Sequence, residues 1–252
     1  MTKLNIPLPG RDYDILIEPG LLDQAGAHCR TVLPRAKKLA VVTDTNVAPL
    51  YAARAEKSLA AAGFAVKIIT IPAGETSKSM QMLEFLYDEF MAFGLTRTDA
   101  VVALGGGVVG DLAGFAAATI LRGVDFVQIP TTLLAQVDSS VGGKVAVDLK
   151  SGKNLAGAFW QPKLVLMDPE CLNTLSDRIF NDGMAEVIKY GCIRDAEFFD
   201  ELLKCGGREG VMGRIEYVLE TCCAIKAQVV LADERDTGLR MILNFGHTLG
   251  HA

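Results

Sequence analysis

The stretch that decides the fold is Ala100-Val-Val-Ala-Leu-Gly-Gly-Gly-Val-Val-Gly-Asp111. Its first five residues form an apolar run that predicts a buried strand, and the apolar residues up to about Leu121 predict a helix. Between them, residues 105–110 match G-x-G-x-x-G. In this strand–turn–helix context, backbone N–H groups and the positive end of the helix can hold a pyrophosphate. The structural alternative is a tight turn that needs positive φ angles.

Similar units flank this stretch on both sides. Residues 39–43 and 64–71 have the apolar pattern of strands, and an alanine-rich amphipathic segment joins them. Apolar residues recur at helical spacing over 80–91, Gly94 is a helix stop signal, and residues 124–129 resemble a further strand. Alternating strands and helices predict a parallel sheet with helices on its faces.

The composition excludes several classes of function. The chain has 252 residues with 25 basic and 30 acidic side chains, a net charge of −5, and hence no basic surface for nucleic acid or membrane. The apolar run 101–121 approaches the length of a transmembrane helix, but its five glycines and Asp111 favour a buried strand–helix unit. Six cysteines without a C-x-x-C pair predict free thiols. We therefore expect a cytoplasmic protein whose partners are small molecules.

The pattern changes near residue 170. Before it, strand-like and helical segments alternate, whereas after it only helical periods remain. We expect a Rossmann-like parallel-sheet α/β domain over residues 1–170, followed by an α-helical domain over residues 171–252. A cleft between the two domains is the expected binding site.

Polar residues at strand ends and in glycine-rich segments are the candidate ligand contacts. Asp44 and Asp125 are both placed to bind a ribose, and we choose Asp44 because it directly follows a strand. Gly142-Gly-Lys144 is not a Walker loop, because Val145 replaces the Ser or Thr that would bind magnesium. In expected loops between 122 and 154, the polar side chains suit anions and hydroxyls, although a solvated surface is the alternative. They are Thr131, Thr132, Asp138, Lys144, Lys153 and Asn154.

Two histidines and one glutamate raise the question of a metal. His247 and His251 are four residues apart, so they share one helix face and could hold zinc together with a third ligand. Capping or surface histidines are the alternative. Glu186 and Lys189 are one helical turn apart, which is also the spacing of a simple salt bridge on a helix face.

Five segments taken together resemble the 3-dehydroquinate synthase family of sugar-phosphate cyclases. They are 105–115, 130–144, 152–159, 184–191 and 244–251, in that order along the chain. The resemblance implies an enzyme of the shikimate pathway, which leads to chorismate and the aromatic amino acids. Its substrate would be 3-deoxy-D-arabino-heptulosonate 7-phosphate and its products 3-dehydroquinate and phosphate. The steps are oxidation by NAD, phosphate elimination, reduction back by the same cofactor, ring opening and aldol closure.

The resemblance also implies roles for individual residues. Glu186 and His247 match two ligands of a divalent metal, zinc or cobalt. Lys189, Lys226, Arg240 and Asp138 match positions that hold the substrate's carboxylate and hydroxyls. Lys144, Asn154, Asn244 and His251 match positions near its phosphate, with Arg122 supplied by a neighbouring subunit of a homodimer. The positions that match NAD contacts are Asp44, Glu75, Lys78, Gly105, Gly106, Gly107, Gly110, Asp111, Thr131, Thr132, Lys144 and Lys153.

Spacing and resemblance disagree about His251. Spacing alone makes it a metal ligand, whereas the resemblance gives it a catalytic role beside the phosphate. We follow the resemblance, and we then expect the third metal ligand beyond residue 252 and an incomplete helical domain. Rival interpretations are another sugar-phosphate cyclase, a glycerol-dehydrogenase-like oxidoreductase, and a fragment that binds NAD without catalysis.

Overall fold

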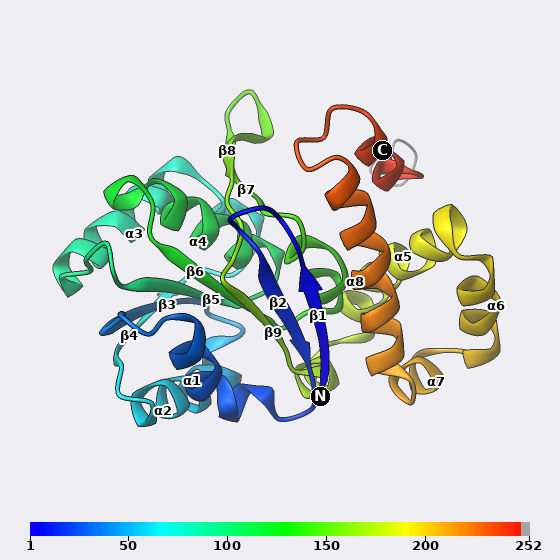
Figure 1. The fold of residues 1–252 in the computed structure, drawn as a ribbon, viewed down its shortest axis with the longest axis horizontal. Helices are drawn as coiled ribbons and strands as arrows, with labels where there is room; N and C mark the ends of the chain where they lie inside the picture. Colours follow the sequence, from blue (N-terminus) through cyan, green and yellow to red (C-terminus); the bar gives the residue numbers. More distant parts are fainter. Residues whose placement is uncertain (248–252) are drawn as a thin grey trace.

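The computed structural model describes residues 1–247 and is built around a seven-stranded sheet (Figure 1). The strand order is β1-β2-β9-β6-β5-β3-β4, and every neighbouring pair except β1 and β2 is parallel. A separate antiparallel hairpin consists of β7 (Lys144–Leu149) and β8 (Gly152–Phe159). The strands of the main sheet are β1 (Thr2–Ile6), β2 (Tyr13–Ile17), β3 (Lys38–Asp44), β4 (Ala65–Ile71), β5 (Ala100–Gly105), β6 (Asp125–Pro130) and β9 (Leu164–Met167).

Helices cover both faces of this sheet. α1 (Leu21–Val32) and α2 (Ala53–Ala61) bury their apolar side chains on one face, and α3 (Met80–Phe93) and α4 (Gly107–Thr119) bury theirs on the other. Successive residues of the central strands point to opposite faces, as pleating requires. Val41 belongs to the first of these cores, for example, and Val42 to the second.

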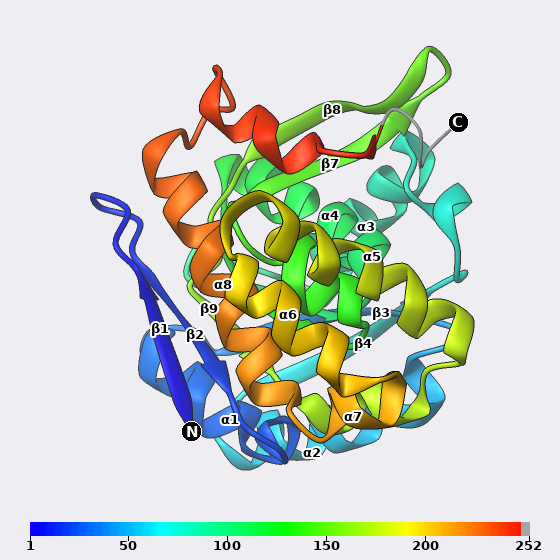
Figure 2. The same ribbon diagram turned by 90° about the vertical axis from the view of Figure 1, so that its right-hand side faces the viewer.

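A group of helices lies beside the β1–β2 edge of the sheet (Figure 2). A third apolar core joins β1, β2 and β9 to these helices. The change from strands to helices therefore comes after β9, and the domain boundary that we propose at residue 170 lies just beyond it. The helices are α5 (Asp177–Arg194), α6 (Ala196–Cys205), α7 (Arg208–Met212) and α8 (Ile215–Ala232).

The central strand–helix units were predicted correctly. The helix expected over 80–91 is α3, which ends at Gly94 with φ +71°. The long apolar run 101–121 is divided between β5 and α4, both deeply buried. Within the described part of the chain, no helix combines the length and apolarity needed to cross a bilayer.

Other elements were not predicted. The sequence pattern did not single out β1, β2, α1 or β9. The polar candidates between 122 and 154 were expected in loops, and for two of them this was wrong, since Lys144 begins β7 and Asn154 lies within β8. Their side chains are therefore held on a hairpin. This hairpin packs against α4, because the Val145 side chain lies directly against Gly114.

One close contact fixes the helical group against the sheet. Gly183 of α5 faces the Leu133 side chain and the Leu134 backbone, and a Cβ atom at Gly183 would lie 2.6 Å from the backbone nitrogen of Leu134. That distance is shorter than van der Waals contact allows, and a backbone atom cannot rotate away. Glycine is therefore required where α5 crosses this segment.

We expect Gly183→Ala to destabilise the protein by about 2 kcal/mol, because α5 must move away from the Leu133–Leu134 backbone. Chemical denaturation measures the free energy of unfolding. The matched control is Gly213→Ala, whose new Cβ atom would have no contact closer than 3.5 Å. The control should be neutral or slightly stabilising, and equal losses in both variants would contradict the proposed contact.

Candidate active site

The parallel strands β3, β5 and β6 end at one level of the sheet. Val42 of β3 pairs with Ala103 of β5, and Gly105 pairs with Pro130 of β6. From β3 the chain passes outward to β4 and then returns to β5 on the other side, so the strand order reverses between β3 and β5. Open α/β sheets bind ligands outside the carboxyl ends of the strands at such a reversal.

The glycine-rich turn lies at this reversal, and α4 begins within it at Gly107. A Cβ atom at Gly105 would lie 2.7 Å from Val109, and one at Gly110 would lie 3.0 Å from Gln128. These glycines therefore allow α4 to pack closely on the sheet. The first N–H groups of a helix have no partner within the helix, so the start of α4 presents donors to an anion.

The other predicted nucleotide contacts lie around the same edge. Asp44 Oδ1 accepts hydrogen bonds from the N–H groups of Asn46 and Val47, and no bond from a described residue reaches its Oδ2. Thr131, 2% exposed, has a buried hydroxyl without a partner among the described residues. Glu75 Oε1 lies 3.5 Å from Lys153 Nζ. One edge of the sheet thus carries the Thr131 hydroxyl and an Asp44 carboxylate oxygen, both without a described partner, and the start of α4. These three features fit a dinucleotide.

Asp111 and Lys78 form a buried ion pair next to this edge. Lys78 Nζ lies 2.5 Å from Asp111 Oδ2. Burial raises the pKa of Asp111 to about 6, although the Lys78 ammonium opposes this shift. Asp111 also lines the neighbouring cleft, so the pair connects that cleft to the edge formed by the ends of β3, β5 and β6, which we call the nucleotide edge after the contacts predicted there.

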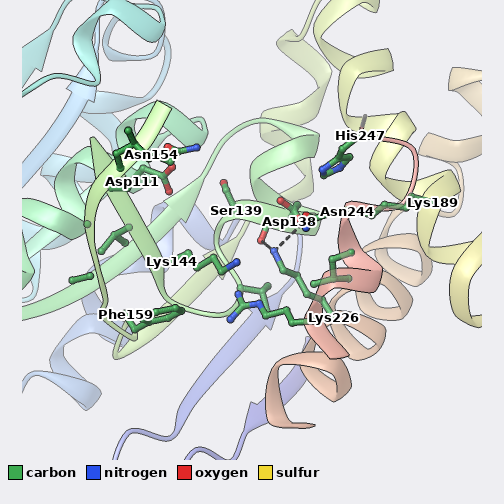
Figure 3. A pocket seen from close by; sticks show the side chains of 18 residues that line it. Asp111, Asp138, Ser139, Lys144, Asn154, Phe159, Lys189, Lys226, Asn244 and His247 are labelled. Carbon is green, nitrogen blue, oxygen red and sulfur yellow. Dashed lines mark hydrogen bonds and ion pairs between the residues drawn. The ribbon is translucent and has the colours of Figure 1, made fainter. Parts of the chain in front are cut away.

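The cleft has a volume of about 630 Å³ and opens between the β7–β8 hairpin and the helical group (Figure 3). In the close-up, Lys144 reaches in from the hairpin and Lys226 from the opposite wall. The predicted site residues that line the cleft are Asp111, Asp138, Lys144, Asn154, Lys189, Lys226, Arg240, Asn244 and His247.

Asp138 is the anion around which one side of the cleft is organised. It belongs to the short helix η4 (Ala135–Ser139), and its Oδ1 lies 2.7 Å from Lys226 Nζ on α8. The same oxygen accepts a hydrogen bond of 3.1 Å from the Tyr190 hydroxyl on α5. Burial alone would raise the pKa of Asp138, but the ammonium groups of Lys226 and Lys189 outweigh it and lower the pKa to about 2. Asp138 is therefore ionised at neutral pH.

A loop after α8 carries Arg240 into the cleft. Asp233 accepts hydrogen bonds from the N–H groups of Thr237, Gly238 and Arg240, and these bonds lower its pKa. Next to it, Glu234 forms two hydrogen bonds with the Arg11 guanidinium, 2.7 and 2.9 Å long. The Arg240 guanidinium donates to Gly142 O and is 3% exposed, and this burial lowers its pKa.

Glu186 meets His247, which lines the cleft. Glu186 Oε1 lies 3.0 Å from His247 Nε2, and the other carboxylate oxygen pairs with Lys189. A carboxylate and an imidazole nitrogen at this separation suit two ligands of a metal ion. Among residues 1–247, no cluster of three or more His, Cys, Asp or Glu side chains could hold a metal. The described residues thus fit part of a metal site.

Two family models match the sequence. The model described as 3-dehydroquinate synthase N-terminal matches residues 68–182, and the one described as 3-dehydroquinate synthase C-terminal matches residues 183–252. A 3-dehydroquinate synthase of Clostridium beijerinckii is 54% identical over 252 residues, which make up 100% of this chain and 72% of that relative. The chain belongs to the 3-dehydroquinate synthase family.

Solved structures of two other synthases share the fold. A 2-deoxy-scyllo-inosose synthase complexed with carbaglucose-6-phosphate, NAD+ and Co2+ superposes with a TM-score of 0.89 at 27% identity, over 99% of this chain and 69% of that one. ValA, the 2-epi-5-epi-valiolone synthase of Streptomyces hygroscopicus subsp. jinggangensis 5008, with NAD+ and Zn2+ bound, has a TM-score of 0.82 at 30% identity, covering 93% and 66%. Related cyclases therefore bind NAD+ and a divalent metal.

Arg122 does not line the cleft of its own chain. It lies in the turn that follows α4, at the opposite end of this helix from Gly107, and is exposed with φ +69°. A role for Arg122 in a neighbouring subunit of a synthase dimer therefore stays a prediction. His251 and any ligand after it lie outside the described residues.

Some residues in this 3-dehydroquinate synthase site were not singled out from the sequence. Ser139 and Asp236 both contact the site, since Ser139 lines the cleft and Asp236 forms an ion pair with Lys144. Tyr190 supports Asp138, and Glu234 anchors the loop of Arg240. Ser139 and Tyr190 lie inside two segments that resemble the family, so the resemblance could have identified them as candidates. For Asp236 and Glu234 no local pattern existed.

We expect Lys78→Met to destabilise the protein in a pH-dependent way. The folded-state pKa of Asp111, about 6, is above its usual value, so the buried carboxyl is mostly neutral at pH 5 and charged at pH 8. Removing the Lys78 ammonium should therefore lower the free energy of unfolding only slightly at pH 5 and by about 3 kcal/mol at pH 8. Denaturant unfolding at both pH values measures the difference.

The control for this measurement is Lys67→Met, which removes a more exposed ion pair with Glu89. It should lose less than about 1 kcal/mol at either pH. If Lys78→Met loses the same free energy of unfolding at pH 5 and pH 8, the assignment of a raised pKa to Asp111 is wrong.

Proposed function

We propose that this protein converts 3-deoxy-D-arabino-heptulosonate 7-phosphate to 3-dehydroquinate and phosphate. The observation that carries the proposal is the convergence of four cationic side chains on one cleft beside the nucleotide edge. They are Lys144, Lys189, Lys226 and Arg240. The substrate has two anionic groups, a carboxylate and a phosphate, and the cations come from two opposite walls. A locally cationic cleft in a chain of net charge −5 favours a small anion over a polyanion.

We assign NAD to the edge formed by β3, β5 and β6. The start of α4, with Gly106 and Gly107, would hold the pyrophosphate, and Asp44 would accept hydrogen bonds from a ribose. Thr131, Thr132, Glu75, Lys78 and Lys153 would surround the rest. Bound NAD would supply the hydride acceptor for oxidation of a ring hydroxyl and return the hydride after elimination.

We assign zinc, or cobalt, to Glu186 and His247. A metal there would polarise the hydroxyl that is oxidised. Lys189 and His247 hold the two oxygens of the Glu186 carboxylate, so the two proposed metal ligands are already side by side. Lys189 would remain near the site as a hydrogen-bond donor to the substrate.

The chain's own residues would bind and orient the substrate. Asp138 stays ionised, so it cannot donate a proton, and it would accept a hydrogen bond from a substrate hydroxyl while it holds Lys226. Lys226 and Arg240 would bind the carboxylate. Lys144, Asn154 and Asn244 would bind the phosphate and neutralise charge as it leaves. We further propose a cytoplasmic homodimer, in which the partner's Arg122 would reach the phosphate.

The test of this function is a phosphate-release assay on the full-length protein, which would carry the third metal ligand expected beyond residue 252, with NAD and zinc present. We expect release from 3-deoxy-D-arabino-heptulosonate 7-phosphate and none from sedoheptulose 7-phosphate or glucose 6-phosphate. A preference for either of the latter would indicate another cyclase. Net NADH accumulation with a simple alcohol would indicate a dehydrogenase, and NAD binding without any turnover would favour a non-catalytic role.

We expect Asp138→Asn to lower kcat/KM about a hundredfold, equivalent to about 2.7 kcal/mol, because Lys226 loses the charge that positions it. Phosphate release against substrate concentration gives this ratio, and circular dichroism checks folding. Asp182→Asn is the control, since Asp182 is exposed on α5. If Asp138→Asn is as active as Asp182→Asn, Asp138 has no role in turnover.

A further inference from the structure

Ser139 has a buried hydroxyl that no described residue satisfies. It is the last residue of η4, directly after Asp138, and its Oγ atom has almost no contact with solvent and no hydrogen-bond partner within residues 1–247. A hydroxyl that loses water without gaining a partner costs free energy. An orphaned group of this kind in a binding cleft calls for a ligand that is bound to it.

The position of Ser139 points to the ligand. Ser139 lines the cleft, and Figure 3 places it between Asp111 and Asp138. Its Oγ atom lies 3.2 Å from where a Cβ atom of Gly107 would be, so the hydroxyl occupies the space beside the first residue of α4. This is the same helix start that presents free N–H groups to an anion.

The neighbouring Ser140 provides a comparison within the chain. Its Oγ atom is also buried without a described partner, and the residue is 0% exposed. Ser140 does not line the cleft, however, and no glycine of the nucleotide edge approaches it. Both serines therefore have a buried hydroxyl without a described partner, but only Ser139 lines the cleft.

We propose that the Ser139 hydroxyl donates a hydrogen bond to a pyrophosphate oxygen of NAD at the start of α4. The inference rests on the proposed function, because it takes NAD as the cofactor of this edge. A hydrogen bond to a charged oxygen is stronger than one between neutral groups. A Cβ atom at Gly107 would lie 3.2 Å from this hydroxyl, so a side chain there would crowd the serine.

Calorimetric titration of wild type, Ser139→Ala and Ser140→Ala with NAD and with ADP-ribose tests the proposal. ADP-ribose keeps the pyrophosphate and lacks the nicotinamide. We expect Ser139→Ala to weaken both ligands about tenfold and Ser140→Ala to weaken neither. Without ligand, the Ser139→Ala melting temperature should equal or exceed that of wild type, because an unsatisfied hydroxyl has been removed.

The other outcomes overturn the proposal in distinguishable ways. Equal affinities in wild type and Ser139→Ala would remove Ser139 from the NAD site and leave the proposed function standing. Weakening of NAD but not of ADP-ribose would move the contact to the nicotinamide end and refute the pyrophosphate assignment. Equal weakening in both variants, or a lower melting temperature in Ser139→Ala, would make the effect structural. No NAD binding by wild type would refute the cofactor itself, and the serine contact with it.

Discussion

The arrangement of the cleft depends on one ion pair between a buried lysine and a partly buried aspartate. Asp138 belongs to the α/β half of the chain, Lys226 belongs to α8, and their side chains meet at 2.7 Å. Tyr190 of α5 hydrogen-bonds to the same carboxylate oxygen. One aspartate therefore holds two helices of the helical group against the sheet. Breaking such a pair would leave an uncompensated charge in a buried place, so the position of the helices relative to the nucleotide edge is narrowly defined.

Among the described side chains that line the cleft, cations outnumber anions, with Lys144, Lys189, Lys226 and Arg240 against Asp111 and Asp138. Asp138 faces Lys226, Lys189 and Arg240, and burial lowers the pKa of both Lys226 and Arg240. A lowered pKa means that the protein pays a cost to keep these groups protonated. Functional sites commonly store such costs. An anionic ligand would relieve this cost, because its negative charge stabilises the protonated forms of Lys226 and Arg240, and the cleft would therefore select for an anion.

Local patterns predicted the parts of this structure that depend on local physics. The turn at Gly105, the strand before it and the stop at Gly94 follow from periodicity and backbone freedom. The hairpin strand β8 was missed because it is rich in glycine and alanine and is exposed along much of its length, without the alternation that marks a half-buried strand. The roles of Asp236 and Glu234 arise only from tertiary contacts, with Lys144 and Arg11 respectively. Family resemblance found Lys144 and Lys226, but it did not reveal what holds them.

The bond between Arg11 and Glu234 has a consequence for the order of folding. The two residues are 223 positions apart in the sequence, so the loop that carries Arg240 gains this anchor only after nearly all of the described chain has been made. The parallel core around β5 depends on closer neighbours and can form earlier during synthesis. Nascent chains would thus acquire a nucleotide edge well before they acquire a complete cleft. Arg11 lies in the turn between β1 and β2, which is translated early, but it is among the last residues to find its partner.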